Sequence, residues 1–358
     1  MASIKQSVRT YESWMRKELG RELVEKDLAR KHEKMGESPF VFLRGTFWRW
    51  AETILEVCPD LAQAPTTLAV GDIHLENFGT WRDDDGRLVW GVNDFDEAAE
   101  MPFAIDLVRL ATSALLARRE RAMTASGICA ALLEGYRQGL DAPKPIVLER
   151  DWAWLRQLVV VPDKARARFW DKTEKADYKP APPRYVEALA SAMPETKLKI
   201  RTAPRTAGTG SLGRPRWIGV ADWRGAPVVR EVKVILASAW PREGQCTGAE
   251  QAMRNDAAAR GKYRANDPWY RLKSNLLVRR LSPNNRKLEA EGGDIDLLTP
   301  DMLRAMGLEL ANVHLGTGNR RGAIVRDLTR RDDDWLHGNA KRAAAAVTRD
   351  YEEWKATA

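Results

Sequence analysis

The chain opens with apolar residues placed at helical spacing among charged ones. Residues 1–36 are rich in Lys, Arg and Glu, and apolar residues such as Trp14, Leu19 and Leu23 recur at intervals typical of one helix face. This pattern predicts an N-terminal helical extension. The segment 38–55 that follows is apolar and aromatic, so we expect it to lie against the core.

Apolar positions continue with a helical period in the next part of the chain. Residues 105–140 read as two helices separated near Ser126 and Gly127, because Ser and Gly favour helix boundaries and turns. Residues 141–200 are charged and punctuated by Trp and Pro, which predicts helices joined by loops. We therefore expect a helical part that spans residues 37–196.

The pattern then changes to short strands. Four β-rich segments are set off by Gly and Pro turns around one helical stretch at 248–260, and their sequences are KLKIRTA, RWIGVAD, PVVREVKVILA and SNLLVRRL. We expect a small sheet-rich part at 197–285. Helical spacing returns after Thr299, a residue suited to cap a helix that begins with Pro300. Residues 286–358 are therefore predicted to rejoin the helical part, and the fold class is α+β.

The composition is that of a globular chain. With 358 residues, of which 44% are apolar, the chain can bury a core, yet no run approaches the roughly 18 consecutive apolar residues of a transmembrane helix. The charged N-terminus does not resemble a secretory signal, so we expect a cytoplasmic protein with no membrane partner. The three cysteines form no metal or disulfide pattern. The net charge of +8 suits an anionic ligand, but the basic residues are scattered, so nucleic acid is not the expected partner.

An acidic hairpin carries the strongest chemical pattern. Two apolar runs, 78–81 and 88–92, flank an Asp-Asp-Asp-Gly turn, which predicts a β-hairpin. A hairpin brings its outer ends together, so Asp72 and Asn77 before it should lie beside Asp94 after it. Clustered carboxylates repel one another unless a cation neutralises them, and Mg2+ prefers oxygen ligands of this kind.

The spacing of these residues matches a kinase site. An Asp followed five residues later by an Asn, and by a second Asp after a hairpin, is the arrangement of the kinase catalytic loop and metal site. We predict Asp72 as the catalytic residue that orients or deprotonates a hydroxyl, and Asn77 and Asp94 as Mg2+ ligands. The alternative is an exposed acidic turn whose carboxylates only cap the next helix. No second His lies nearby, so His74 is not expected to be a metal ligand.

A glycine-rich segment supplies a possible second half of the site. The sequence GTGSLG lies between two predicted strands, and such a loop can cover nucleotide phosphates. The residues predicted to bind ATP there are Gly208, Thr209, Gly210, Ser211, Leu212 and Gly213. A dinucleotide-binding loop would instead open a helix, and Arg214 followed by Pro215 is a poor helix start. A plain glycine turn remains the simpler alternative.

Lys233 lies in a predicted strand after this segment, where kinases carry the lysine that pairs with nucleotide phosphates. Glu250, at the start of the predicted helix 248–260, is the candidate partner of Lys233 within the ATP site. Strand alternation puts Glu231 on the same face as Lys233, near the expected adenine, where kinases commonly have Ala. We expect Glu231 to alter base preference or to shift the nucleotide.

The two halves of the site occur in the reverse of the usual kinase order. Asp72, Asn77 and Asp94 precede the glycine-rich segment and Lys233, which indicates a circular permutation. Such a change needs only old termini that can be joined and a new break in an exposed connection. We expect Lys233 to face Asp94 across a cleft, within roughly 10 Å when phosphates lie between them. The predicted helix at 301–315 should then pack in the helical part.

Several motifs resemble known families. The segment GDIHLEN resembles the catalytic loop of the aminoglycoside phosphotransferase and choline kinase branch of the protein-kinase-like superfamily. That resemblance implies that Asp106 supports the loop and that His74 holds loop backbone rather than acting as a base. Val70 departs from it, because the branch usually has His there. The chain also resembles the bacterial family named domain of unknown function 2252 over about residues 30–355. The motifs that carry this resemblance are, in order, KMGESPFVFLRG, GDIHLENFG, NDFDE, GTGSLG, the lysine strand and ELANVH. This resemblance implies a two-lobed, kinase-like fold and brings no established substrate.

These predictions combine into one functional hypothesis. We expect an enzyme, an ATP- and Mg2+-dependent phosphotransferase, that acts on a hydroxyl of a small molecule in preference to a protein. A nucleotidyl transferase would use the same metal site but would transfer AMP. A protein that binds nucleotide without turnover is the third possibility.

Overall fold

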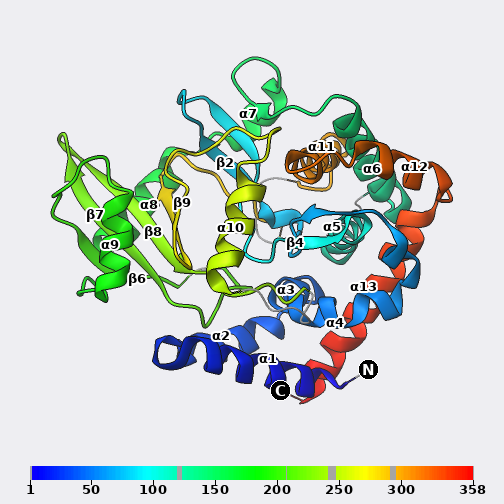
Figure 1. Ribbon diagram of the computed structural model, residues 1–358, viewed down its shortest axis with the longest axis horizontal. Helices are drawn as coiled ribbons and strands as arrows, with labels where there is room; N and C mark the ends of the chain where they lie inside the picture. The colour runs from blue at the N-terminus through cyan, green and yellow to red at the C-terminus, as the bar shows by residue number, and fades with distance from the viewer. Residues whose placement is uncertain (1, 119–122, 207, 241–246, 291–295, 358) are drawn as a thin grey trace.

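Helices form where apolar residues recur at helical spacing, and strands form in the short β-rich segments. Together they make a mixed α+β structure (Figure 1). The computed structural model describes residues 2–118, 123–206, 208–240, 247–290 and 296–357. The helices are α1 (Ile4–Leu19), α2 (Glu25–Met35), α3 (Pro39–Gly45), α4 (Phe47–Val57), α5 (Phe103–Ala117), α6 (Ala125–Asp141), α7 (Ala153–Val159), α8 (Asp163–Glu174), α9 (Pro183–Ser191), α10 (Gly248–Ala259), α11 (Pro300–Gly316), α12 (Arg321–Arg330) and α13 (Trp335–Thr357). The strands are β1 (Thr66–Ala69), β2 (Phe78–Arg82), β3 (Leu88–Val92), β4 (Ala99–Pro102), β5 (Ile146–Val147), β6 (Arg201–Pro204), β7 (Arg216–Trp223), β8 (Ala226–Val234), β9 (Arg271–Lys273) and β10 (Leu276–Leu281).

The four β-rich segments form one antiparallel sheet in the order β6-β7-β8-β10-β9, as the strand pattern predicts. A two-residue turn joins β7 to β8, and both of its residues have positive φ, 50° for Arg224 and 82° for Gly225. This is the backbone conformation that a tight hairpin requires. In the register of the sheet, Lys233 of β8 lies between Arg216 of β7 and Leu277 of β10.

Helices α8 and α9, which the sequence pattern assigned to the helical part, pack against the five-stranded sheet instead. Phe169 of α8 joins a small apolar cluster with Ile218 on one face of β7. An added side-chain carbon at the next residue, Gly219, would lie 3.0 Å from Leu189 of α9. Because neighbouring residues of a strand point to opposite faces, the two helices cover opposite faces of the sheet.

Two smaller sheets lie outside the five-stranded one. Strands β1 and β4 pair with each other, and the predicted hairpin is the antiparallel pair β2–β3, extended by β5. The two predicted helices that follow are α5 and α6, and α6 begins with Thr124 as its N-cap. Helix α11 begins as predicted, with the Thr299 hydroxyl accepting a hydrogen bond from the Met302 N–H. It packs against α6 in the helical part (Figure 1).

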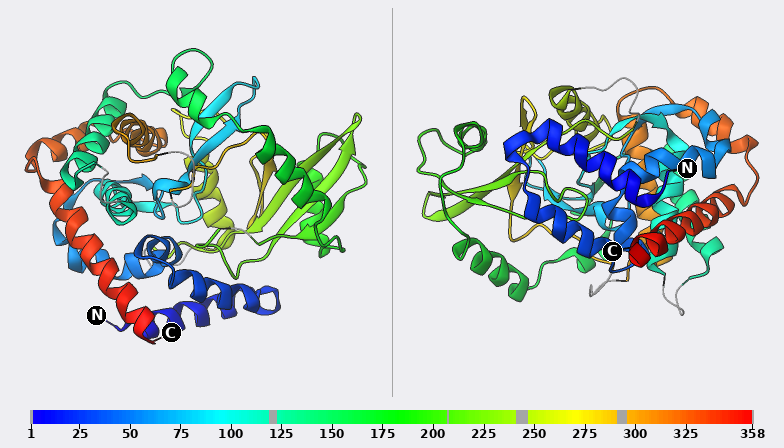
Figure 2. Two further views of the ribbon diagram at one scale, coloured as in Figure 1. Left: turned by 180° about the vertical axis from the view of Figure 1, so that it is seen from behind. Right: turned by 90° about the horizontal axis from the view of Figure 1, so that it is seen from below.

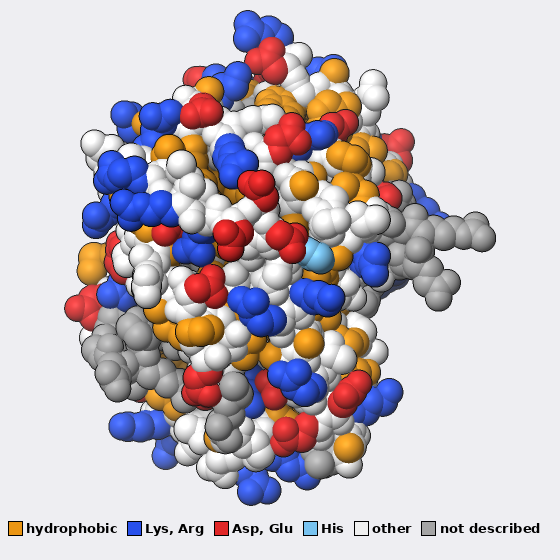
Figure 3. Space-filling model, turned by 90° about the vertical axis from the view of Figure 1, so that its right-hand side faces the viewer, with side chains coloured by type: hydrophobic (Ala, Val, Ile, Leu, Met, Phe, Trp, Pro, Cys, Tyr) orange, Lys and Arg blue, Asp and Glu red, His pale blue; other side chains and the backbone are white. Residues whose placement is uncertain are grey.

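The two ends of the chain lie close together (Figure 2). The Ile4 N–H at the start of α1 donates a hydrogen bond of 3.2 Å to the carboxylate of Glu353 in α13. Arg49 of α4 adds to this contact, because its guanidinium binds both the Ala2 carbonyl and the Asp350 carboxylate. On the face drawn in Figure 3, basic and acidic side chains are interspersed over most of the surface.

Helices α6 and α11 approach so closely that glycine is required at their contact. A side-chain carbon added at Gly135 would lie 1.9 Å from the Arg304 carbonyl oxygen, and one added at Gly307 would lie 2.1 Å from that of Leu132. Both atoms belong to backbone, which cannot move without shifting a helix. The close approach therefore depends on the two glycines.

Gly307→Ala should reduce the free energy of unfolding by about 1–3 kcal/mol, because the new methyl group forces the two helices apart. Gly338→Ala in α13 is the control, since its nearest new contact is the end of the Arg342 side chain at 3.8 Å. That change should be neutral or stabilise by about 0.5–1 kcal/mol through the better helix propensity of Ala. Urea denaturation measures both. Equal stability of the two variants would contradict the close packing.

Candidate functional site

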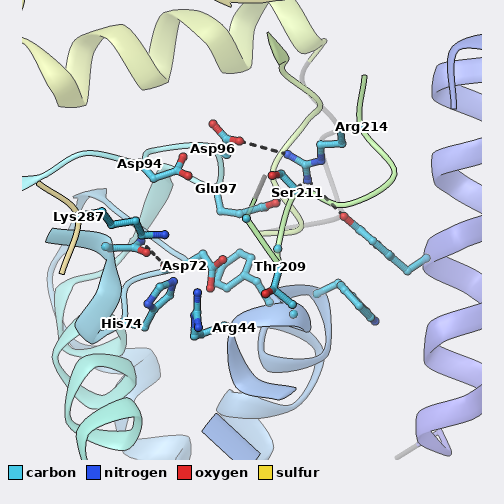
Figure 4. A pocket seen from close by; sticks show the side chains of 17 residues that line it. Arg44, Asp72, His74, Asp94, Asp96, Glu97, Thr209, Ser211, Arg214 and Lys287 are labelled. Carbon is cyan, nitrogen blue, oxygen red and sulfur yellow. Dashed lines mark hydrogen bonds and ion pairs between the residues drawn. The ribbon is translucent and has the colours of Figure 1, made fainter. Parts of the chain in front are cut away.

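Three of the segments singled out in the sequence line one connected region between the sheet and the helical part, whereas the Lys233 strand does not line it. A cavity of about 520 Å3 is lined by Asn77 and Asp94 on one side and by Gly208, Thr209 and Ser211 on another. A smaller adjoining cavity of about 60 Å3 shares these residues and adds Asp72. Figure 4 shows the glycine-loop residues facing the acidic residues across this space. The structure thus brings the two predicted halves of the site together.

The loop that carries Asp72 is held by a carboxylate of helix α5. Both oxygens of Asp106 accept hydrogen bonds from loop backbone, 2.7 Å from the Val70 N–H and 3.0 Å from the Gly71 N–H. Asp106 also contacts His314 of α11 at 3.1 Å, and the other ring nitrogen of His314 lies 2.8 Å from the Tyr136 hydroxyl of α6. Asp106 therefore occupies the supporting position that the resemblance implies.

Asp72 lies at the floor of the site beside a buried cation. Its carboxylate accepts a hydrogen bond from the guanidinium of Arg109, which lies one turn after Asp106 on α5. Arg109 is fully buried and is fixed by a 2.9 Å hydrogen bond to the Leu43 carbonyl and by the ring of Trp50. Burial raises the pKa of Asp72 to about 7, although the charge of Arg109 opposes this shift. A carboxyl group with such a pKa can exchange a proton at neutral pH.

Asn77 is oriented by the same loop. Its side-chain N–H donates a 2.6 Å hydrogen bond to the Asp72 carbonyl, which leaves its oxygen as the atom able to bind a cation. His74 is buried, and its Nδ1 accepts a hydrogen bond from the Glu76 N–H. Burial lowers the pKa of His74 well below the ordinary value, so the ring is neutral. These contacts agree with the prediction that His74 holds loop backbone.

Lys233 reaches the acidic end of the hairpin directly. Its ammonium lies 3.0 Å from Asp94 and 2.5 Å from Asp96. Lys233 and Asp94 are therefore within the predicted distance, but they form a direct ion pair instead of facing each other across a cleft. Burial alone would raise the pKa of Asp94, but the positive charges of Lys233 and Arg279 outweigh burial and lower it. Asp94 is therefore ionised, as a metal ligand must be.

The predicted pairing of Glu250 with Lys233 is absent. Glu250 is the third residue of α10, and its carboxylate accepts a 2.6 Å hydrogen bond from the Thr247 N–H in a capping box. The helix N-terminus thus uses this carboxylate for its own unsatisfied N–H group. Lys233 takes its acidic partners from the hairpin end instead, so Glu250 does not belong to the site.

The glycine loop (residues 208–213) joins β6 to β7 and is held from below by the N-terminal helices. Lys31 of α2 is buried, and its ammonium donates a 3.1 Å hydrogen bond to the Gly210 carbonyl. The Val24 N–H, just before α2, donates to the Gly213 carbonyl at 3.0 Å. A side-chain carbon added at Gly210 would lie 3.2 Å from the Asp72 carboxylate, so the tip of the loop lies directly over Asp72.

Several charged residues of the site were missed by the sequence analysis. Arg44 forms a 2.7 Å ion pair with Glu76, and Lys287 lies beside it in both cavities. Arg214, directly after the glycine loop, forms a 2.8 Å ion pair with Glu97. These contacts join residues far apart in the chain, so no local spacing could have predicted them. The arginine of the FLRG motif and the arginine after GTGSLG were the only available indications.

Within the described residues, no helix is both long and apolar enough to cross a membrane. The same part of the chain contains no group of three or more His, Cys, Asp or Glu side chains arranged to hold a metal ion. Any Mg2+ bound by Asn77 and Asp94 must therefore take its other ligands from water or substrate, which is the usual way in which proteins bind Mg2+ with phosphates.

Lys31, which binds the glycine loop, gives the free energy of unfolding a measurable pH dependence. Burial, with the charge of Arg214, lowers the pKa of Lys31 to about 7. An unfolded lysine keeps its proton to about pH 10.4, so the unfolded state binds more protons between these values and the free energy of unfolding rises with pH there. Lys31→Met should remove this rise, which is at most about 1.4 kcal/mol per pH unit.

The measurement is urea denaturation at pH 7, 8 and 9. Lys26→Met is the matched control, because Lys26 is an exposed lysine on the same helix. The wild-type protein and this control should gain stability in parallel, and Lys31→Met should lag behind them as the pH rises. A Lys31→Met profile parallel to the wild type would show that Lys31 is not held as a buried amine.

Comparison with known proteins identifies one family. The family model described as "Uncharacterized protein conserved in bacteria (DUF2252)" matches residues 21–176 and 156–357. No curated protein and no solved structure gives a significant match. The two matched ranges overlap and together span most of the chain, as the resemblance of its motifs to domain of unknown function 2252 predicted. The chain therefore belongs to the bacterial DUF2252 family.

Proposed function

We propose that this protein is an ATP- and Mg2+-dependent phosphotransferase that acts on a hydroxyl group of a small molecule. The observation that carries the proposal is the convergence of three elements on two adjoining cavities. The loop with Asp72 and Asn77, the hairpin end with Asp94, and the glycine loop line these cavities, and Lys233 pairs with Asp94 from the sheet without lining either cavity. Phosphoryl transfer requires these parts: a residue that positions the hydroxyl, a metal site and cations for the phosphates.

The proposed fold is a two-lobed, kinase-like one with a circularly permuted chain. The five-stranded sheet with its glycine loop and Lys233 would be the small lobe, and the helical part around Asp72 would be the large one. The ends of the chain lie side by side through the contact of Ile4 with Glu353. Joining them and opening the chain between α9 and β6 would give the usual kinase order of parts, which supports the permutation.

The residues at the hairpin end fit Mg2+. Asp94 is ionised, and the amide of Asn77 is held with its nitrogen turned toward the loop, which leaves its oxygen for a cation. Bound there, Mg2+ would neutralise phosphate charge and orient the phosphate chain. One carboxylate and one amide are a sparse ligand set, so the metal would bind tightly only together with phosphate oxygens.

Asp72 is placed to position the acceptor hydroxyl. Arg109 fixes one of its oxygens from below, while the other faces the glycine loop. The raised pKa of Asp72 suits a group that accepts a proton as the hydroxyl attacks. Because the tip of the glycine loop lies over Asp72, the loop must move outward when both substrates bind, as lids over active sites commonly do.

The variants Asp72→Asn and Asp94→Asn separate the two roles. Asp72→Asn should keep Mg–ATP affinity within about threefold and abolish turnover, because it removes only the proton acceptor. Asp94→Asn should weaken Mg2+-dependent ATP binding by about tenfold or more, because it removes a charged ligand. Calorimetry measures binding, and mass spectrometry of a metabolite extract incubated with Mg–ATP detects the product.

The matched control is Asp84→Asn, which changes an exposed carboxylate in the hairpin turn and should leave binding and turnover unchanged. A product heavier by one phosphate supports a phosphotransferase, whereas a product heavier by AMP would replace it with a nucleotidyl transferase. No Mg2+-dependent ATP binding at millimolar concentration would overturn the proposal.

A further inference from the structure

Glu231, on the strand that carries Lys233, is surrounded by three arginines. Its carboxylate is fully buried and pairs with Arg216 at 2.7 Å, with Arg279 at 2.8 Å and with Arg205. The arginines come from three parts of the sheet: Arg205 follows β6, Arg216 opens β7 and Arg279 lies in β10. In the register of the strands, Arg279 lies directly opposite Glu231.

One carboxylate cannot neutralise three guanidinium groups. All three arginines line the 520 Å3 cavity, and Glu231 does not. Burial, together with repulsion from the other arginines, lowers the pKa of Arg205 to about 9 and that of Arg216 to about 10. Arg216 is buried, whereas Arg205 and Arg279 are partly buried, and the nearby Asp96 and Asp94 carboxylates oppose the lowering of the Arg216 pKa. Like charges gathered in this way raise the free energy of the folded protein unless an anion lies near them.

This cluster continues the phosphate-binding features of the site without a gap. Arg216 lies opposite Lys233 in the sheet, and its guanidinium also donates a 2.9 Å hydrogen bond to the Ser211 hydroxyl of the glycine loop. Glu231 and Arg279 are the next pair on the same face of the sheet, one two-residue step from Lys233. Arg216 and Arg279 therefore continue the row of cations from the buried Lys233 onto the sheet wall of the cavity, which Lys233 itself does not line.

An adenine would lie against this wall in a kinase-like site. Flat purine rings bind between apolar surfaces, and burying charged side chains against them costs free energy unless those charges are paired. Here the wall offers guanidinium groups, which bind phosphate oxygens in pairs. The aromatic side chains in the cavity lining, such as Trp81 and Tyr270, come from other elements.

We propose that Arg205, Arg216 and Arg279, gathered by Glu231, form an anion subsite that binds a phosphate group of the ligand in this cavity. The ligand is a polyphosphate compound that the protein recognises by its phosphate chain rather than by adenine. This inference rests on the proposed function for the placement of phosphate at Lys233. It differs from that function in what it predicts for a ligand that has no base.

The probe is inorganic tripolyphosphate, compared with ATP and adenosine by calorimetry at the same free Mg2+ concentration. Tripolyphosphate should bind within about tenfold of the affinity for ATP, and adenosine should show no binding, because charged hydrogen bonds to phosphate supply most of the affinity. Arg279→Gln should weaken tripolyphosphate and ATP alike by about tenfold, the loss of one such bond.

Arg280→Gln is the matched control. Arg280 is the neighbouring arginine on β10 and lines the same cavity, but its guanidinium binds the Asp267 carboxylate and the Arg82 carbonyl. This variant should change tripolyphosphate affinity less than about threefold, since it removes no group of the subsite. Arg279→Gln leaves Glu231 with two arginine partners, and circular dichroism on heating checks that it folds.

The outcomes separate this inference from the proposed function. If ATP binds and tripolyphosphate does not, or if a folded Arg279→Gln variant binds tripolyphosphate as well as the wild type does, the subsite is refuted and the phosphotransferase proposal stands. If tripolyphosphate binding depends on Arg279 while ATP gives no product, the subsite stands and the proposed function fails. If neither compound binds, both are refuted.

Discussion

The buried carboxylate of Asp106 fixes the loop on which the candidate site depends. It accepts the Val70 and Gly71 N–H groups at the point where the chain leaves β1. A buried backbone N–H without a partner costs about 1–3 kcal/mol, so this loop shape is stable only while helix α5 holds the carboxylate in place. His314 of α11 and Tyr136 of α6 extend the same network into the helical core. One chain of hydrogen bonds thereby joins the close packing of α6 and α11 to the backbone directly before Asp72.

The opposite side of the site depends on the N-terminal helices. Helices α1 and α2 cover the glycine loop from outside the sheet, with Lys31 bonded to the Gly210 carbonyl and Val24 to that of Gly213 (Figure 2). The ammonium of Lys31 also lies 4.5 Å from the ring of Trp48 in α4, so it connects the loop to the helical part. In the proposed function, a ligand that lifts the loop would break or carry these contacts, so the N-terminal extension would move with the loop.

The structural elements predicted correctly from the sequence are those that depend on residues close together in the chain. The hairpin turn and the Thr299 cap depend on residues within a few positions of one another, and both are present. Glu250 failed because its predicted role needed a partner across the fold, whereas capping its own helix required only Thr247. Lys31 gave no indication either, since its charge looked like that of a solvated helix until the fold buried it. Short-range patterns specify elements, while the direction of a long charged side chain is decided by what the fold leaves unpaired.

The candidate site depends on where its charged side chains lie in space, and less on the order of their segments along the chain. From the floor of the site to the sheet, two carboxylates lie between two cations: Arg109 pairs with Asp72, and Lys233 pairs with Asp94. Each charge is placed by a different segment, so the order of these segments along the chain is free to change while the two pairs are kept. Beyond Lys233 this balance of charge ends, because three arginines share Glu231. A phosphate-bearing ligand would neutralise that excess of positive charge. The sheet wall would therefore attract anions, which the acidic floor of the site would not.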